Sequence, residues 1–334
     1  MIQETNQTWT PPPNLKISDW SDNYRRLSPE SSAEAGAWRT DRAPYQREIM
    51  DSFNDPDIQR IVFMKSAQVG ATEILLNVIG YYIDQDPAPM LIMQPTLQMA
   101  QAFSKDRLAT MIRDSEKIRD CVKDPRSRDS GNTVLSKKFA GGNLNIVGSN
   151  SASGLASRPI RIVLADEVDR YEQSAGAEGD PISLATKRTT TFWNKKIYMC
   201  STPTIKGLSR IETAFEESDK RYYHVPCPEC NESQVLKWKN VVWDEDKPET
   251  ASYACEHCGS VIDESKKQWM LKHGEWIASA PKSDTAGFHI SELYSVWSTW
   301  ADMAKSFLEA KKNPEMLKTW INTALGESWE EQGE

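Results

Sequence analysis

Residues 61–73 read IVFMKSAQVGATE, an apolar run that passes through a short polar turn into a second apolar segment. A phosphate-binding loop of the form G-x-x-x-x-G-K-[ST] closes its backbone N–H groups on the phosphates, and its lysine reaches the β- and γ-oxygens. With Gly70 aligned on the second glycine, Thr72 falls on the magnesium-binding hydroxyl, Ala71 on the lysine and Lys65 on the first glycine. The stretch therefore predicts a rearranged phosphate loop, which is active if Lys65 supplies the missing charge.

The surrounding sequence predicts the strand, loop and helix that such a loop requires. Residues 72–87 are apolar at helical spacing and end near a proline, so the loop precedes a helix amino terminus. Strands alternate with helices over about 170 residues, which favours a doubly wound α/β domain. The expected strands are residues 60–64, 90–94, 144–148, 160–165 and 196–201.

Composition limits the class of protein. The 334 residues, 39% apolar and 26% charged, are enough for one large core or two modest ones. A formal charge of −8 argues against a protein that simply coats nucleic acid, because that needs a dominant basic surface. No apolar run of about eighteen residues and no signal-peptide pattern occurs, so we expect a cytoplasmic protein without a membrane segment.

A second chemical signal lies at the end of an expected strand, in IRIVLADEVDRY at residues 160–171. Open α/β sheets bind ligands at the carboxyl ends of their strands, where Asp166 and Glu167 fall. Asp166 would then hold Mg²⁺, and Glu167 would polarise the water that attacks a γ-phosphate. The alternative, a solvated acidic turn, is weakened by the phosphate-loop pattern about ninety residues earlier.

Weaker candidates surround these two signals. CSTPT at residues 200–204 ends the next strand, and Ser201, Thr202 and Thr204 could pass nucleotide state to a substrate-binding face. The alternative for this motif is a strand cap before a proline turn. Tyr45 and Gln46 lie about twenty residues before Lys65, where a ring could stack on adenine and an amide could read its edge. The alternative for that pair is an ordinary helix start.

An arginine is also a candidate for stabilising transition-state charge. Arg158 precedes the acidic strand and could act within its own subunit or on a neighbour. Arg161 and Arg170 are the less favoured choices, and a surface role is the alternative for each of the three.

The cysteines form the most specific local pattern. The pairs CPEC and CEHC have the spacing of two zinc knuckles, which bring four thiolates into a tetrahedron. We expect Cys227, Cys230, Cys255 and Cys258 to hold a structural zinc ion, with four reduced core cysteines as the alternative. Farther on, we expect Trp297, Trp300 and Trp320 to pack in a core rather than to stack on bases.

The motif order resembles the large terminase subunit of lambda-type tailed phages, the GpA-like family. The resemblance covers roughly residues 43–333 and rests on six stretches: KSAQVGAT (65–72), QPT (94–96), LADEVD (164–169), CSTPT (200–204), HVPCPEC (224–230) and GFHISELYS (287–295). In that family a lysine at the start of the loop replaces the usual one, which matches Lys65. The resemblance implies a RecA-like (ASCE) P-loop ATPase with a doubly wound, mostly parallel sheet, a small zinc-ribbon insertion and a helical tail.

Carried over by position, the resemblance assigns roles to the residues of the loop and the strand ends. It implies that ATP is bound by Lys65, Ser66, Ala67, Gln68, Val69, Gly70, Ala71 and Thr72. It further implies that Thr72 and Asp166 hold Mg²⁺, that Glu167 is the catalytic base, and that residues 201–204 couple hydrolysis to movement.

The resemblance also implies partners and a division of the chain. Proteins of this family are ATP-driven motors that move double-stranded DNA into a procapsid, with a small terminase subunit and a portal protein, as homo-oligomeric rings in the host cytoplasm. We expect an extended arm at residues 1–42, an ATPase core at 43–220, a zinc ribbon at 221–265 and a helix-rich tail at 266–334. The acids of WEEQGE (329–334) read as a charged tail, so we expect no nuclease domain. A helicase-like remodelling ATPase and a non-catalytic assembly module remain the alternatives.

Overall fold

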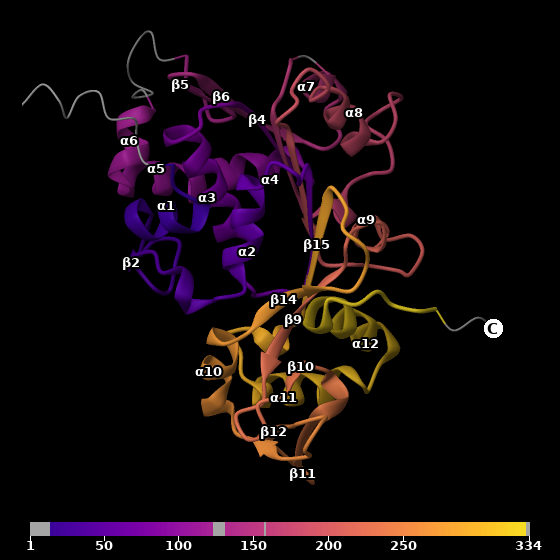
Figure 1. The fold of residues 1–334 in the computed structure, drawn as a ribbon. Helices are drawn as coiled ribbons and strands as arrows, with labels where there is room; N and C mark the ends of the chain where they lie inside the picture. The colour runs from indigo at the N-terminus through magenta and orange to yellow at the C-terminus, as the bar shows by residue number, and fades with distance from the viewer. Residues whose placement is uncertain (1–13, 123–130, 157, 332–334) are drawn as a thin grey trace, which may run out of the picture.

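A large, mostly parallel β-sheet organises the molecule. The computed structural model describes residues 14–122, 131–156 and 158–331. Helices lie on both sides of the sheet, and a smaller lobe extends from one end (Figure 1). The smaller lobe contains β10 (Ser233–Val235), β11 (Val241–Asp244), β12 (Lys247–Ala254), α10 (Lys267–Lys272) and α11 (Trp300–Ala310). Within the described residues, no helix is long and apolar enough to cross a membrane.

The strand order places the expected strands side by side in the middle of the sheet. Neighbouring strands from β9 to β6 run parallel, whereas β10, β14 and β5 pair antiparallel at the margins. In spatial order the strands are β10 (Ser233–Val235), β9 (Arg221–Pro226), β15 (Thr285–Ile290), β3 (Arg60–Lys65), β8 (Lys196–Ser201), β7 (Ile162–Asp166), β4 (Pro89–Gln94), β6 (Gly142–Gly148) and β5 (Ser136–Phe139), with β14 (Glu275–Ala278) paired to β9.

Successive strand residues face two separate cores. Ile61 and Phe63 of β3 join the core beneath the amino-terminal helices, while Val62 and Met64 join the core beneath α7 to α9. The helices are α1 (Ile17–Tyr24), α2 (Gln46–Asp51), α3 (Ala71–Asp84), α4 (Leu97–Ala102), α5 (Ala109–Asp114), α6 (Glu116–Cys121), α7 (Ala152–Ala156), α8 (Pro181–Lys187), α9 (Arg210–Glu216), α10 (Lys267–Lys272), α11 (Trp300–Ala310) and α12 (Pro314–Trp320). A mostly parallel sheet covered by helices on both faces is the architecture expected from the sequence.

The amino-terminal segment departs from the expected extended arm. Residues 17–24 form α1, and Trp20 is fully buried with its indole N–H donating to Asp84 of α3 at 2.8 Å. The expectation of an extended arm is wrong for residues 17–24, because the apolar side chains of this weakly periodic segment pack against α3. The prolines at residues 11–13 lie outside the described residues.

The expected helix-rich tail is wrong for residues 275–290. β14 pairs with β9, and β15 lies between β9 and β3, parallel to the strand that leads into the phosphate loop. Ala286, Phe288 and Ile290 are fully buried at every second position, which is a strand period. β15 is only six residues long, so its alternation of buried residues was not recognisable as a strand pattern in the sequence. The helical expectation holds beyond it, in α11 and α12.

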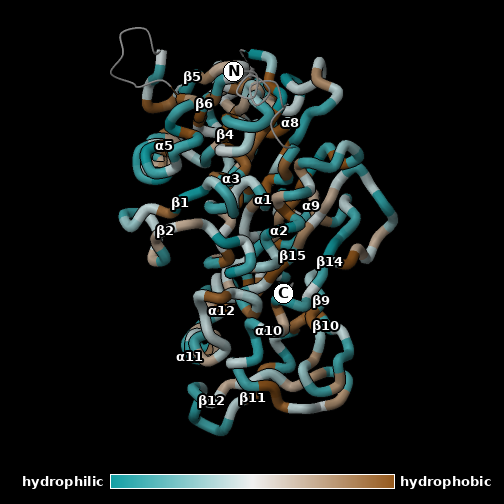
Figure 2. Tube along the Cα trace, turned by 60° about the vertical axis from the view of Figure 1, so that its left-hand side comes forward, coloured by the Kyte–Doolittle hydropathy of each residue, from teal (hydrophilic) through white to brown (hydrophobic). Residues whose placement is uncertain are grey.

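The smaller lobe contains a three-stranded sheet of β11 (Val241–Asp244), β12 (Lys247–Ala254) and β13 (Val261–Ile262). Rings of Trp238, Phe307 and Trp320 contact one another with centroids 4.8–5.2 Å apart and join this lobe to α11 and α12. Trp300 and Trp320 are therefore core residues, as expected, but Trp297 is 43% exposed and the same expectation is wrong for it. Figure 2 shows the hydrophobic stretches gathered along inner strands and the hydrophilic ones along outer segments.

Candidate active site

The phosphate loop connects the carboxyl end of β3 to the first turn of α3. Gln68 has φ 57° and Gly70 has φ 79°, so the chain turns sharply before the helix begins at Ala71. A side chain at Gly70 would be strained in this left-handed conformation, and its Cβ would displace the Gln46 amide nitrogen, which lies 2.2 Å from the position that the Cβ would take. Within the described residues, the N–H groups of Gln68, Val69 and Gly70 donate to no protein acceptor. Such a helix amino terminus is suited to an anion.

Lys65 folds toward the acidic strand end. Its Nζ lies 2.8 Å from Oε1 of Glu167, although Lys65 ends β3, Glu167 follows β7, and β8 lies between these two strands. Both side chains are largely shielded, at 8% and 18% exposure. Burial acts to lower the pKa of Lys65, but the neighbouring acidic groups, with Glu167 first among them, together outweigh it and the pKa ends above its usual value. Lys65 is therefore a charged ammonium inside the site.

Asp166 and Glu167 occupy different environments although they are adjacent. Asp166 ends β7 and accepts hydrogen bonds from the Gln94 amide at 3.0 Å and the Cys200 thiol at 3.1 Å. Burial, with the Glu167 charge beside it, raises the pKa of Asp166. Glu167 follows in the left-handed region with φ 54°, and its Oε2 is buried without a hydrogen-bond partner. Glu167 is thus a strained residue whose Oε1 accepts a hydrogen bond from Lys65 and whose Oε2 accepts none.

The CSTPT segment contacts the acidic turn. Ser201 Oγ accepts from the backbone N–H of Asp169 at 3.3 Å, and Thr204 Oγ1 donates to the Asp169 carboxylate at 2.9 Å. Asp169 is two residues from Glu167, so the end of β8 is linked to the turn that carries the carboxylate. No hydrogen bond of the Thr202 side chain is found in the described part of the chain.

Segments from the carboxyl-terminal quarter of the chain form hydrogen bonds with the phosphate loop. The sequence did not indicate these contacts. The Ser66 N–H donates to Ile290 of β15 at 3.0 Å, and the Ala67 N–H donates to Thr323 at 2.7 Å. Ser295 Oγ donates to the Gln68 carbonyl at 2.8 Å. Gly326 packs so closely that a Cβ there would lie 2.9 Å from Ser66 N.

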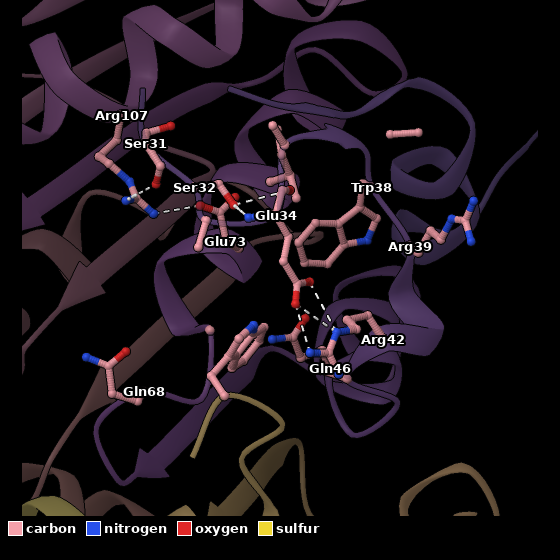
Figure 3. Close-up of a pocket in the computed structure, with 17 residues that line it drawn as sticks. Ser31, Ser32, Glu34, Trp38, Arg39, Arg42, Gln46, Gln68, Glu73 and Arg107 are labelled. Atoms are coloured by element: carbon pink, nitrogen blue, oxygen red, sulfur yellow. Dashed lines mark hydrogen bonds and ion pairs between the residues drawn. The ribbon is translucent and has the colours of Figure 1, made fainter. Parts of the chain in front are cut away.

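A cavity of about 500 Å³ opens beside the loop, and Figure 3 shows the residues that line it. Gln46 lines this cavity, with its amide N–H donating to the Val69 carbonyl at 3.0 Å and its Oε1 buried without a partner. Tyr45 does not line it. Its ring is fully buried against Tyr223, and its hydroxyl donates to Val69 at 3.1 Å. The expectation that Tyr45 stacks on adenine is therefore wrong in this structure, because the ring braces the loop from the core.

The three candidate arginines lie in different places. Arg158 is exposed and donates to Asn145 on β6 at 3.3 Å, without an ion pair to Glu167. Arg161 pairs with Asp86, which follows α3 and precedes β4, away from the carboxyl ends of the strands. Arg170 is the one beside the catalytic candidate, with Nε 3.8 Å from Glu167 Oε2.

The four cysteines converge in the smaller lobe. The sulfur atoms of Cys227, Cys230, Cys255 and Cys258 all lie within 4.8 Å of one another. Two of the distances, Cys227–Cys258 and Cys230–Cys255, are 3.9 Å. Tetrahedral zinc with Zn–S bonds of about 2.3 Å requires sulfur atoms about 3.8 Å apart. Backbone N–H groups of Glu229 and His257 donate to Cys227 and Cys255, as they would to thiolates. The donor set fits zinc.

A strand-end lysine, adjacent acids and a loop with free N–H groups define a nucleotide-hydrolase type of site. Residues 32–276 match the family model described as "Phage terminase large subunit gpA, ATPase domain". The chain belongs to this family.

The relatives carry the same name. The chain is 34% identical to the terminase large subunit of Enterobacteria phage P21 and 30% identical to that of Escherichia phage lambda, over 96% of this chain and 53% of each relative. It thus spans about half the length of the curated relatives it matches. The crystal structure of the HK97 bacteriophage large terminase has a similar fold, with a TM-score of 0.58 and 11% identity over 94% of this chain and 55% of that one.

A second family match corrects one expectation. Residues 285–334 match the model described as "Terminase large subunit gpA, endonuclease domain". The expectation that the chain has no nuclease domain is therefore not confirmed. The matched residues include β15 and the segments that support the phosphate loop.

Proposed function

We propose that this chain hydrolyses ATP to move double-stranded DNA into a procapsid, as the ATPase part of a terminase. The observation that carries the proposal is the 2.8 Å pair between Lys65 and Glu167, a shielded ammonium beside a carboxylate at the start of the phosphate loop. A non-catalytic assembly module would have no need of this buried pair.

The loop would hold the triphosphate through backbone and lysine together. The free N–H groups of Gln68, Val69 and Gly70 meet the phosphate oxygens, with Ser66, Ala67, Ala71 and Thr72 completing the turn. The Lys65 ammonium is shared between Glu167 and the β- and γ-oxygens. Ala71 then needs no positive charge, because Lys65 delivers it from the other end of the loop.

Magnesium fits the oxygen donors at the strand ends. Asp166 and the Thr72 hydroxyl would hold it, and it would supply positive charge against the charge that develops on the phosphates. Two adjacent carboxyl groups face the Lys65 ammonium, with the Arg170 guanidinium 3.8 Å from Glu167 Oε2. Burial, and after it the Glu167 charge, raises the pKa of Asp166, so a charged Asp166 carboxylate is costly in this site. A divalent cation would remove the electrostatic cost.

Glu167 would act on the attacking water. Its Oε2, which lacks a hydrogen-bond partner, accepts the water proton as the water oxygen bonds to the γ-phosphorus. The bond from that phosphorus to the β–γ bridging oxygen breaks, leaving ADP and phosphate. The hydrogen bond from the Asp169 N–H to Ser201 Oγ and the one from Thr204 Oγ1 to the Asp169 carboxylate would carry the change at Glu167 into the end of β8, with Thr202 between them.

Gln46 would read the base in the adjoining cavity. Its Oε1 needs a donor, and the exocyclic amino group of adenine is one, whereas guanine presents an acceptor at the same position. Loss of a buried hydrogen-bond partner is the kind of difference that gives strong discrimination.

The remaining assignments concern zinc, the partners and Arg158, and the partners among them rest on the family. The four-cysteine cluster would hold structural zinc, which contributes folding free energy rather than chemistry. The partners would be double-stranded DNA, a small terminase subunit and a portal protein or procapsid, met in the host cytoplasm by a homo-oligomeric ring. Arg158 is exposed and does not pair with Glu167, so any catalytic role for it would be on a neighbouring copy.

ATP hydrolysis measured with and without linear double-stranded DNA tests the proposal. We expect hydrolysis that DNA accelerates. We expect the Glu167→Gln variant to bind ATP but to hydrolyse it at least about a hundredfold more slowly, the range for loss of a general base. A parent protein that is inactive at every protein concentration, with and without DNA, would contradict the proposal and favour an assembly role.

A further inference from the structure

Part of the wall of the cavity beside the phosphate loop comes from outside the residues that match the ATPase family model. Trp297 lines the cavity together with Gln68 and Gly70 of the loop. It lies beyond residue 276, where the match to the ATPase model ends, and inside the endonuclease match. The nearest ring atom is 3.1 Å from the position that a Cβ on Gly70 would take, so the indole touches the loop at the helix start.

The segment that carries Trp297 is fixed to the loop and to its own surroundings. Ser295 Oγ donates to the Gln68 carbonyl at 2.8 Å and accepts from the Trp297 N–H at 3.2 Å. On the far side, Lys267 Nζ donates to the Ser298 carbonyl at 2.8 Å. The backbone on both sides of Trp297 is thus fixed by hydrogen bonds. Because Trp297 is 43% exposed, its ring keeps a free aromatic surface, unlike the buried Trp300.

Two other residues of the cavity wall, Trp38 and Gln46, suit a base, although charged side chains also line the cavity. Trp38 supplies a second ring that is 7% exposed, and its indole N–H is already used by Thr40 at 2.9 Å. The unpartnered, fully buried Gln46 Oε1 is the polar group of this wall that lacks a donor. Figure 3 shows Trp38 and Gln46 on the same cavity, with the Glu34–Arg42 ion pair between their segments.

We propose that Trp297 stacks on the base of the bound nucleotide, so that a residue from outside the ATPase match completes the nucleotide site. This inference rests on the proposed function, because it requires that the loop beside Trp297 bind a nucleoside triphosphate. Aromatic stacking needs only a flat ring within reach, and Trp297 provides the more exposed of the two tryptophan faces at the cavity. Trp297 therefore contributes affinity, and Gln46 contributes the choice of base.

The test compares ligands with and without a base. Affinities of the full chain for ATP and for inorganic tripolyphosphate are measured in the parent, Trp297→Ala, Trp297→Phe and Trp193→Ala. Trp193 is the matched control, because it is 82% exposed on a different part of the surface. We expect Trp297→Ala to weaken ATP binding about tenfold or more and to leave tripolyphosphate binding unchanged. Trp297→Phe should stay within about threefold of the parent, because the ring is retained.

Hydrolysis kinetics add a readout that a structural role would not produce. We expect Trp297→Ala to raise KM for ATP with kcat within about twofold, because stacking is the same in the ground and transition states. Unchanged ATP affinity in Trp297→Ala overturns the inference, and so does an equal loss for ATP and tripolyphosphate, which would make Trp297 a loop support. A parent that binds neither ligand refutes the proposed function itself, which distinguishes the two failures.

Discussion

The phosphate loop and the four-cysteine cluster are both chemical sites, but they are assembled in different ways. All four sulfur ligands come from residues 227–258, and the pairs themselves set the geometry. The loop depends on residues from Gln46 to Gly326, contributed by the core, the acidic strand end and the carboxyl-terminal quarter. A locally encoded site should fail locally when it is altered, whereas the loop should be sensitive to changes far away in the sequence.

Zinc removal should give the largest effect. Replacing Cys227 and Cys255 with serine should abolish zinc binding and lower the free energy of unfolding by more than about 4 kcal/mol, because the small lobe loses its metal cross-link. Zinc content and urea unfolding measure the two effects. Cys121→Ser is the control, because Cys121 lies outside the cluster on α6. A double variant as stable as this control would show that the cysteines are ordinary core residues.

Lys65→Ala should give the largest effect at the loop. We expect ATP hydrolysis to fall about a hundredfold, which corresponds to about 2.7 kcal/mol of lost transition-state stabilisation. The matched control is Lys206→Ala, which removes an exposed lysine that pairs with Glu330. Zinc content should be the same in both variants, because the two sites are separate. Full activity in Lys65→Ala would disprove the displaced-lysine arrangement.

Gly326→Ala tests whether distant residues support the loop. Gly326 has φ 64°, and a Cβ there would lie 2.9 Å from backbone atoms of Lys65 and Ser66. Gly207 is the matched control, because it has φ 78° and nothing lies within 4 Å of the position that a Cβ on it would take.

Both alanine variants carry the cost of a left-handed conformation, about 1 kcal/mol, but only Gly326→Ala adds a clash with the loop backbone. We therefore expect a loss of about 2–3 kcal/mol for Gly326→Ala in urea unfolding, with a raised KM for ATP. Equal losses in the two variants would mean that the carboxyl-terminal segment adapts without disturbing the loop.

The same contrast explains what the sequence could predict. The cysteine spacing, the strand-end acids and Lys65 are visible because each belongs to a short pattern with known chemistry. Tyr45 was misplaced because an aromatic residue at a helix start has the same pattern whether its ring faces a ligand or the core. β15 and Trp297 were missed as parts of the site because pairing between strands more than two hundred residues apart leaves no local signal. The helical packing of residues 17–24 was missed for a similar reason, since its partner is α3.

A pH measurement gives the smallest and most specific test of the long-range support. His289 of β15 donates through Nε2 to the Gly326 carbonyl at 3.0 Å, and burial lowers the pKa of His289 to about 4. In the unfolded chain its pKa is near 6.5, so on acidification the unfolded state takes up a proton before the folded state does. This contribution to stability is full above about pH 6.5 and is lost as the pH falls toward 4.

Between pH 7 and pH 5 the expected loss is about 2 kcal/mol, at 1.36 kcal/mol per pKa unit. His289→Gln can keep an N–H donor but cannot be protonated, so its free energy of unfolding should fall less over that range than the parent's. His273→Gln, at an exposed histidine, should follow the parent. If His289→Gln also follows the parent, protonation at this position does not release the segment beneath the loop, and acid sensitivity must arise elsewhere in the molecule.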